Sequence, residues 1–351
     1  MPAWVPLNIN LYQSRYRALI GVGGIGTGWF FALSGDHTLG REESRLGRFL
    51  DRRDYCKLHI IAHYIQTLLG PQFHTLPIGK VGDDESGRRL LDEMGATGMD
   101  LRYVQIVPGE QTMSSICFVY PDGTGGNLTS EDSANARVGA GDIVAAESEF
   151  VRYRGQGIVL AAPEVALEAR HKLLQMGSQY GFYRVLALNS AETRSSLAEQ
   201  MLEVTDLLAI NLDEAAALAG IEADTSPESI VGKVIDRLRL AREGLCISIT
   251  AGRHGSWAWD GKRLNQTPAL AVKAVSTAGA GDAHLAGMIV GMVADLSLAE
   301  AQELGTLVAA LSITSPHTIH PAIDRVTLGE FAAHVEAKLH QKVRNLSEIQ
   351  T

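Results

Sequence analysis

This chain of 351 residues has few cysteines, and its basic residues are outnumbered by acidic ones. Its only cysteines are Cys56, Cys117 and Cys246, and their wide spacing is typical of neither a zinc site nor a disulfide framework. The formal charge of −9 at pH 7 argues against nucleic acid or an anionic membrane as the main partner. The expected partner is therefore a small molecule, in a reducing compartment.

Long apolar runs are also missing. No stretch approaches the length needed to span a bilayer, and residues 1–16 hold no uninterrupted apolar core followed by a cleavage site. We therefore expect a cytoplasmic protein that is neither exported nor anchored in a membrane. The hydrophobic content of 46% still allows a large core, in one big α/β domain with an appendage or in two medium domains.

Strand and helix patterns alternate along most of the chain. Apolar residues recur at helical spacing over residues 58–69, for example, and Gly70-Pro71 ends that helix. Such alternation predicts an α/β protein with a mainly parallel sheet. Strands are expected at residues 17–24, 157–161, 183–188, 207–211, 245–250 and 256–259, and helices at residues 58–69, 84–94, 164–176, 227–242, 283–292, 298–314 and 328–339.

Two segments, 30–55 and 99–129, interrupt this alternation. A strand at 115–120 leads into a turn rich in proline and glycine at 121–126, which is typical of a hairpin. We expect both segments to form a small β lid, and residues 1–29, 56–98 and 130–351 to form the large domain. Charges of both signs crowd residues 41–54, where a solvated helical face is favoured over a clamp for an anionic substrate.

The most informative stretch is 275–287, in which Gly279 and Gly281 precede Asp282 at an expected helix start. The glycines let an anion approach the backbone, and a helix start directs free amides toward that anion. A phosphate repels the carboxylate of Asp282, but this carboxylate can accept the proton of a hydroxyl that attacks the phosphate. The pattern thus predicts phosphoryl transfer with Asp282 as base. The structural alternative is an acid that only stabilises the helix start.

Three further patterns carry less weight. Residues 21–26 fit the Gly-x-Gly-x-x-Gly fingerprint of dinucleotide sites, but strand-like aromatic residues follow where a helix is required. A dehydrogenase therefore stays a minor alternative. A second Gly-Ala-Gly-Asp at 139–142 is expected to be a helix start without chemistry. His59 and His63 lie four apart on one helix, where half-buried positions are favoured over a pair of metal ligands.

Four motifs occur in the order and spacing of the ribokinase-like sugar kinases, or PfkB carbohydrate kinases, which the chain resembles from about Leu19 to Pro321. They are the glycine-rich turn at 79–87, Asn211-Leu212-Asp213-Glu214, the segment 250–255, and the segment 277–283. The resemblance implies a doubly wound α/β domain that binds ATP, with a small β lid over the acceptor. It also implies transfer of the γ-phosphoryl group to an alcohol.

The resemblance further implies a role for each matching residue. Asp282 would be the base, and the amides of Gly279, Ala280, Gly281 and Asp282 would hold the transferred group. Mg²⁺ would be held through water by Asn211 and Glu214. The other residues implied are Asn189, Thr250, Gly252, Gly255 and Thr277 beside the nucleotide, Gly28, Lys57 and His59 beside the acceptor, and Ser276, Ser312 and Ser315 near a monovalent cation such as K⁺.

Departures from the family pattern fall mainly on the acceptor side. The carboxylate that usually binds sugar hydroxyls is missing near Gly28, and residues 54–59 lack the usual glycine pair and asparagine. Ser276-Thr277 replaces Asp-Thr, and His284 replaces an aromatic residue. We expect an ATP-dependent kinase for a sugar or related small polyol, dimeric through its lid. A nucleoside kinase and a non-catalytic ligand-binding relative remain alternatives.

Overall fold

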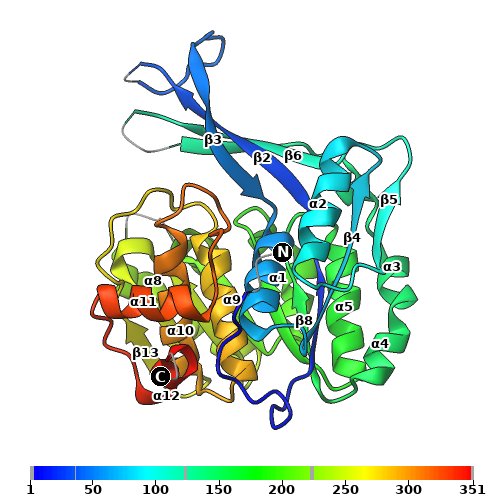
Figure 1. Cartoon of the computed structure of the whole chain (residues 1–351), viewed down its shortest axis with the longest axis vertical. Helices are drawn as coiled ribbons and strands as arrows, with labels where there is room; N and C mark the ends of the chain where they lie inside the picture. The colour runs from blue at the N-terminus through cyan, green and yellow to red at the C-terminus, as the bar shows by residue number, and fades with distance from the viewer. Residues whose placement is uncertain (1–3, 36, 122–124, 222–224, 349–351) are drawn as a thin grey trace.

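The computed structural model describes residues 4–35, 37–121, 125–221 and 225–348. A large, mainly parallel sheet forms the body, and a smaller sheet projects from it as a lid (Figure 1). The large sheet has the order β13-β12-β11-β10-β9-β8-β1-β4-β5, in which β12 pairs antiparallel with both β11 and β13 and the other pairs of described strands are parallel. Its strands are β1 (Ala18–Val22), β4 (His74–Gly82), β5 (Val104–Val107), β8 (Gly157–Ala161), β9 (Tyr183–Ala187), β10 (Leu207–Asn211), β11 (Cys246–Thr250), β12 (Ser256–Trp259) and β13 (Leu264–Thr267).

Helices cover both faces of this sheet, which confirms the predicted doubly wound α/β fold. The central strands β1 and β8 are buried along their whole length, because both of their faces pack against helices. On one face lie α1 (Lys57–Leu69), α2 (Glu85–Ala96), α9 (Ala280–Val293), α10 (Leu298–Ser312), α11 (Arg325–His334) and α12 (Gln341–Ser347). On the other lie α3 (Ala140–Ala145), α4 (Glu147–Arg152), α5 (Leu167–Gln179), α6 (Ser196–Glu203), α7 (Leu212–Ala219) and α8 (Pro227–Ala241).

The lid sheet has the order β3-β2-β6-β7. Its strands are β2 (Gly26–Leu33), β3 (Gly47–Tyr55), β6 (Met113–Val119) and β7 (Gly125–Thr129). β6 and β7 form the expected hairpin, whereas residues 122–124 of the predicted turn lie outside the described residues. β2 and β6 pair in parallel, so the lid joins two chain segments that are far apart in the sequence.

Three local predictions about the lid need correction. The charged residues 47–55 form the strand β3, not a helical face, because they pair with β2 and alternate between its two sides. The lid sheet already begins at Gly26, since β2 continues almost directly from β1. β5, expected in the lid, instead pairs with β4 at the edge of the large sheet.

The carboxyl ends of β10 and β11 lie beside the start of α9 at one edge of the large sheet. Ligands of open parallel sheets bind at such an edge. None of the helices within the described ranges is both long and apolar enough to cross a membrane.

Candidate active site

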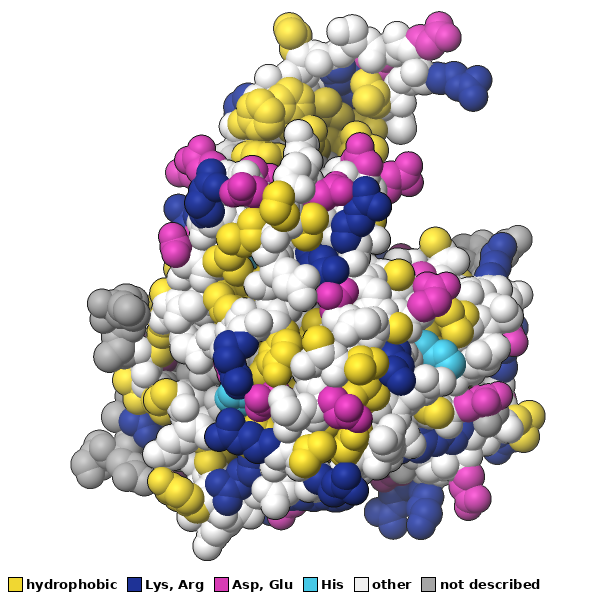
Figure 2. All heavy atoms as spheres, turned by 90° about the vertical axis from the view of Figure 1, so that its right-hand side faces the viewer, with side chains coloured by type: hydrophobic (Ala, Val, Ile, Leu, Met, Phe, Trp, Pro, Cys, Tyr) yellow, Lys and Arg dark blue, Asp and Glu magenta, His cyan; other side chains and the backbone are white. Residues whose placement is uncertain are grey.

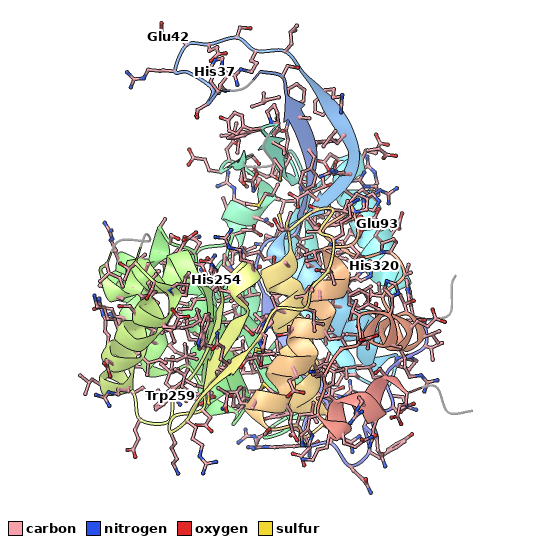
Figure 3. The ribbon with its side chains drawn as sticks, turned by 90° about the vertical axis from the view of Figure 1, so that its left-hand side faces the viewer. His37, Glu42, Glu93, His254, Trp259 and His320 are labelled. Atoms are coloured by element: carbon pink, nitrogen blue, oxygen red, sulfur yellow. The ribbon has the colours of Figure 1, made fainter. Side chains whose placement is uncertain are left out.

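In the described part of the chain, two cavities meet at this edge of the sheet. The first, of about 560 Å³, lies over the ends of β10 and β11. The second, of about 850 Å³, lies between the lid and the body. Figure 3 shows His254 on the body beneath the lid, whereas His37 and Glu42 lie at the far tip of the lid. The residues that line both cavities are Lys57, Ala274, Thr277, Gly279 and Asp282.

Asp282 stands at this junction because of the backbone turn before it. Gly279 caps the start of α9 with φ of 77°, in the left-handed region where a side chain is disfavoured. A Cβ atom at this position would also lie 2.9 Å from the carbonyl oxygen of Thr318. Glycine is therefore required here, and the turn sets the direction in which the first turn of α9 faces the cavities.

The first turn of α9 leaves backbone amides free, as expected for an anion site. Among the described residues, the amides of Gly279, Gly281 and Asp282 have no hydrogen-bond acceptor. The amide of Ala280 donates to the carbonyl oxygen of Thr277 at 3.3 Å, so it is partly engaged. All four residues line the first cavity, where sequence reasoning placed them.

The Asp282 carboxylate is only 16% exposed and lies 3.9 Å from the Lys57 ammonium. Burial raises the pKa of Asp282, while the positive charge of Lys57 opposes this rise and the nearby Asp54 adds to it. In turn, the negative charge of Asp282 raises the pKa of Lys57. The charge of Lys57 therefore favours the ionised form of Asp282, against the effect of burial.

Glu164 is a residue of this site that sequence reasoning missed. Its φ of 78° is unusual for a residue with a side chain, and such strain is found mainly at functional sites. It lines the second cavity and accepts a hydrogen bond from the backbone N–H of Lys57 at 3.0 Å. Burial raises its pKa to about 7. The signal in the sequence was the position of this acid three residues after the end of the buried strand β8. The sequence suggested a helix from residue 164, whereas α5 begins at Leu167.

Asn211 and Glu214 form a reciprocal cap at the start of α7. Each backbone N–H donates to the other residue's side-chain oxygen at 2.8 Å. Helix capping alone could explain why Asn and Glu occur at this spacing, but both residues also line the first cavity. The second carboxylate oxygen of Glu214 has no hydrogen-bond partner among the described residues, and burial raises the pKa of this side chain. A carboxylate oxygen in a cavity wall is the type of ligand that suits Mg²⁺ or the waters bound to it.

Most of the predicted nucleotide residues come together, with one exception. Thr250, Gly252, Gly255 and Thr277 line the first cavity. Asn189 lines neither cavity, because its side chain and backbone bind Glu192 at 3.1 and 3.0 Å in a local turn. The prediction for Asn189 is therefore not supported by its position.

On the acceptor side, Lys57 lines the second cavity, but His59 and Gly28 do not. His59 is 1% exposed, packs edge-on against Tyr55, and has a pKa well below its usual range because of burial. Gly28 is covered by Asp54, since a Cβ atom on this glycine would lie 2.7 Å from the Asp54 carboxylate. The structure thus brings neither His59 nor Gly28 to the wall of the second cavity, where the sequence had predicted acceptor contacts.

The other sequence patterns have structural roles. Asp142 accepts from the N–H of Gly139 at 2.8 Å and pairs with Lys80 at 2.9 Å, away from both cavities. His63 is half-buried, its partial burial lowers its pKa to about 4, and its ring packs edge-on against that of Trp4. At residues 21–26, β1 passes into β2 without a helix, so the dinucleotide fingerprint has no helix start to bind a phosphate.

The segments named for a monovalent cation are neighbours. The amides of Val275 and Ser276 donate to the carbonyl oxygen of Ile313 at 2.7 and 3.3 Å. The side chains of Ser312 and Ser315 are buried; Ser312 Oγ donates to the carbonyl oxygen of Ala309 in α10 at 2.8 Å, and Ser315 Oγ accepts from the N–H of His317 at 3.0 Å. His284 is buried and lines the first cavity.

Lid arginines divide by orientation. Arg45 pairs with Glu43 at 2.7 Å, and Arg53 pairs with Glu93 at 3.5 Å. Arg48 and Arg52 instead line the second cavity, and neither has a carboxylate partner among the described residues. Other polar side chains of the lid also line the second cavity, namely those of Asp54, Ser115, Cys117, Asn127 and Thr129.

Comparison with known proteins supports one interpretation of this geometry. The family model described as pfkB family carbohydrate kinase matches residues 61–325. An ATP-dependent ribose-1-phosphate kinase of Halopiger xanaduensis is 28% identical over 258 residues, which cover 72% of this chain and 78% of the relative. A bifunctional ribokinase/ribose-5-phosphate isomerase A of Fructilactobacillus sanfranciscensis is 25% identical over 221 residues. That alignment covers 63% of this chain but only 39% of the longer relative.

Solved structures show the same fold. Ribokinase of Arabidopsis thaliana, in complex with ribose and ATP, superimposes with a TM-score of 0.71 at 19% identity. The superposition covers 95% of this chain and all of the other.

Proposed function

Because the chain belongs to the pfkB family of carbohydrate kinases, which transfer a phosphoryl group from ATP to an alcohol, we propose which of its residues carry the transfer. The observation that carries the proposal is the position of Asp282 where the two cavities meet. ATP would occupy the first cavity with its γ-phosphoryl group at the start of α9. A hydroxyl of a sugar or related small polyol would enter from the second.

Asp282 would remove the proton of the attacking hydroxyl, since among the described residues it has the only carboxylate that lines both cavities. The free amides of Gly279, Gly281 and Asp282 would bind the charge that develops on the transferred group. Lys57 would keep Asp282 ionised and attract the phosphates. Thr250, Gly252, Gly255 and Thr277 would form the wall beside the nucleotide.

Metal ions would assist from the nucleotide side. Mg²⁺ would supply positive charge that neutralises the phosphates. Asn211 and Glu214 would hold its water ligands, because both line the cavity and Glu214 keeps a free carboxylate oxygen. Backbone oxygens of the adjoining segments at 275–276 and 313–315 would hold a monovalent cation such as K⁺.

The decisive experiment compares two aspartates of identical local sequence. Asp282→Asn should reduce acceptor-dependent ADP formation by about a hundredfold or more, because a general base is lost while the side-chain size is kept. Asp142→Asn, in the second Gly-Ala-Gly-Asp, should leave turnover within about twofold of the wild type, since Asp142 lies outside both cavities.

The acceptor panel should contain neutral sugars, polyols and nucleosides, together with sugar phosphates and sugar acids because of Arg48 and Arg52. Equal turnover of the two aspartate variants would overturn the assignment of the base. Binding of acceptors without any ATP consumption would instead favour a non-catalytic ligand-binding protein, and binding of NADH rather than ATP would favour a dehydrogenase.

A homodimer through the lid is part of this proposal. The lid face turned away from the second cavity exposes large apolar side chains, and Figure 2 shows hydrophobic side chains gathered on the projecting sheet. These side chains are Trp29, Phe49, Ile116 and Leu128. Exposed apolar patches of this kind are typical of interaction sites, and light scattering on the purified protein measures the mass directly. The free state of all three cysteines fits the proposed cytoplasmic location.

A further inference from the structure

The buried carboxylate of Asp54 has no counter-charge. Asp54, on β3, is 8% exposed, and no lysine, arginine or histidine of the described residues pairs with it. Its Oδ2 atom accepts hydrogen bonds from Ser115 Oγ at 2.9 Å and Cys117 Sγ at 3.2 Å. A buried charge is costly unless it is paired or hydrogen-bonded, so this arrangement calls for further donors.

The second carboxylate oxygen of Asp54 is open to such donors. Oδ1 has no hydrogen-bond partner among the described residues. This oxygen is not one of the fully buried polar atoms that lack a partner, so it is accessible. Asp54 lines the second cavity. An acceptor molecule in this cavity therefore meets a carboxylate oxygen that is free to accept hydrogen bonds from its hydroxyl groups.

The neighbouring strand explains how the chain accommodates a carboxylate here. Gly28 on β2 is the direct cross-strand partner of Asp54, and Ser115 on β6 is the partner of Gly28 on its other side. The three positions thus lie in one row on the same face of the lid. Because Gly28 has no side chain, Asp54 and Ser115 meet across it at 2.9 Å.

The same cavity wall contains Asp282, and the charge of Asp54 is close enough to raise the pKa of Asp282. Other acids near the cavity are already engaged. Asp282 pairs with Lys57, and Glu164 accepts the N–H of Lys57. Among the described residues, Asp54 is the only carboxylate of the lid that lines this cavity.

We propose that Asp54 binds hydroxyl groups of the acceptor, so that a carboxylate on β3 does the work of the one missing at Gly28 on the adjacent strand. This inference rests on the proposed function and adds an acceptor-binding residue to it. Asp54 orients a polyhydroxylated acceptor from the lid side, with Ser115 and Cys117 holding its carboxylate, while Asp282 activates one hydroxyl from the body side. The acceptor class is therefore a compound with at least two hydroxyl groups, one for Asp54 and one for Asp282.

The test uses Asp54→Asn in the full chain, with Asp51→Asn as control. Asp51 lies on the same strand but is exposed and lines neither cavity. Asp54→Asn should raise the KM of the best acceptor by roughly tenfold to a hundredfold, because a hydrogen bond to a charged group is lost. The KM of ATP should stay within about twofold, and Asp51→Asn should change neither value by more than about twofold.

A swap of the two cross-strand positions gives an independent readout. Gly28→Asp alone should weaken acceptor binding, because its side chain collides with Asp54 and places like charges together. The double variant Gly28→Asp, Asp54→Gly should bind the acceptor more tightly than Gly28→Asp alone and than Asp54→Gly alone. Thermal melting of each variant without ligand identifies any loss that comes from misfolding.

The outcomes separate the two proposals. Acceptor binding should also be measured directly, by thermal shift or calorimetry, because it does not depend on turnover. If Asp54→Asn keeps the wild-type KM and affinity for the acceptor while Asp282→Asn abolishes turnover, Asp54 has only a structural role and the kinase assignment stands. If the wild type binds none of the hydroxylated compounds in the panel, the acceptor role of Asp54 is overturned as well.

Discussion

The proposed nucleotide side and the proposed acceptor side of the cleft obtain their polar groups in different ways. The nucleotide side uses backbone amides, tight glycine turns and a helix start at the edge of the parallel sheet. The acceptor side uses side chains that converge from separate strands of the lid, such as Asp54 from β3 and Ser115 from β6. Backbone geometry depends on a short local motif, whereas a wall of side chains can change one residue at a time. This difference explains how one side can follow a family pattern while the other departs from it.

Gly279→Ala should cause the largest loss of activity, because it distorts the backbone turn that lies between the two cavities. The new Cβ would lie 2.9 Å from the Thr318 oxygen, in a left-handed conformation that costs about 1 kcal/mol even without a clash. Displaced amides should lower kcat by about a hundredfold, the usual loss for one misplaced anion-binding donor.

Gly281→Ala is the matched control for stability. The nearest atom to a Cβ at Gly281 is Thr250 Oγ1, at an ordinary contact distance of 3.9 Å. Thermal melting should therefore show a lower melting temperature for Gly279→Ala than for Gly281→Ala. Wild-type kcat in Gly279→Ala would mean that transfer does not use the amides of this turn.

Lys57→Gln should shift the pH dependence, because Lys57 lies between the two sides. Burial raises the pKa of Asp282 and Lys57 opposes that rise, so removal of Lys57 leaves the pKa of Asp282 higher still. The base is then protonated over a wider acidic range. We expect the acidic limb of the kcat/KM profile to move to higher pH, with a greater loss at pH 6 than at pH 9.

Lys80→Gln serves as the control for this shift, since Lys80 pairs with Asp142 at 2.9 Å in the duplicate motif. Its pH profile should overlay that of the wild type. A profile of Lys57→Gln that also overlays the wild type would contradict the electrostatic coupling between Lys57 and Asp282.

Glu214→Gln should have the smallest of these effects and should be confined to the nucleotide side. The amide oxygen of Gln can still accept from the N–H of Asn211, so the cap of α7 is kept while the charge is lost. The Mg²⁺ concentration for half-maximal activity should rise by about tenfold, with no change in acceptor KM.

Glu300→Gln tests whether capping alone explains such a result. Ser297 and Glu300 form the same reciprocal cap at the start of α10, with distances of 2.8 and 3.3 Å, but they line neither cavity. This variant should keep the wild-type Mg²⁺ requirement. Equal requirements in both variants would assign Glu214 to helix capping only.

The sequence predicted the fold well, and it named most of the residues that line the first cavity, because both depend on neighbours in the chain. Asn211 and Glu214 are three residues apart and make their contacts locally, and the turn before Asp282 is contained within one motif. The alternation of strands and helices likewise follows from local periodicity.

The acceptor side could not be predicted in the same way. Asp54 and Ser115 are 61 residues apart and meet only through strand pairing, and β3 is so rich in charge that it suggested a helical surface. His59 matched a contact position in the family pattern but faces the core, and Glu164 depends on an unusual backbone angle that propensities do not reveal. Register and long-range pairing decide these positions.

The bulge in β3 ties the chemistry of the lid to the length of its strands. Between the pairs Trp29–Arg53 and Phe30–Leu50, β3 carries two extra residues, an even number that leaves the alternation of its faces intact. Arg48, Leu50, Arg52 and Asp54 therefore all line the cavity. Substitutions on one face can alter the choice of acceptor without touching the other face, so the two surfaces are free to evolve separately. An insertion or deletion of a single residue in β3 would exchange the two surfaces at once.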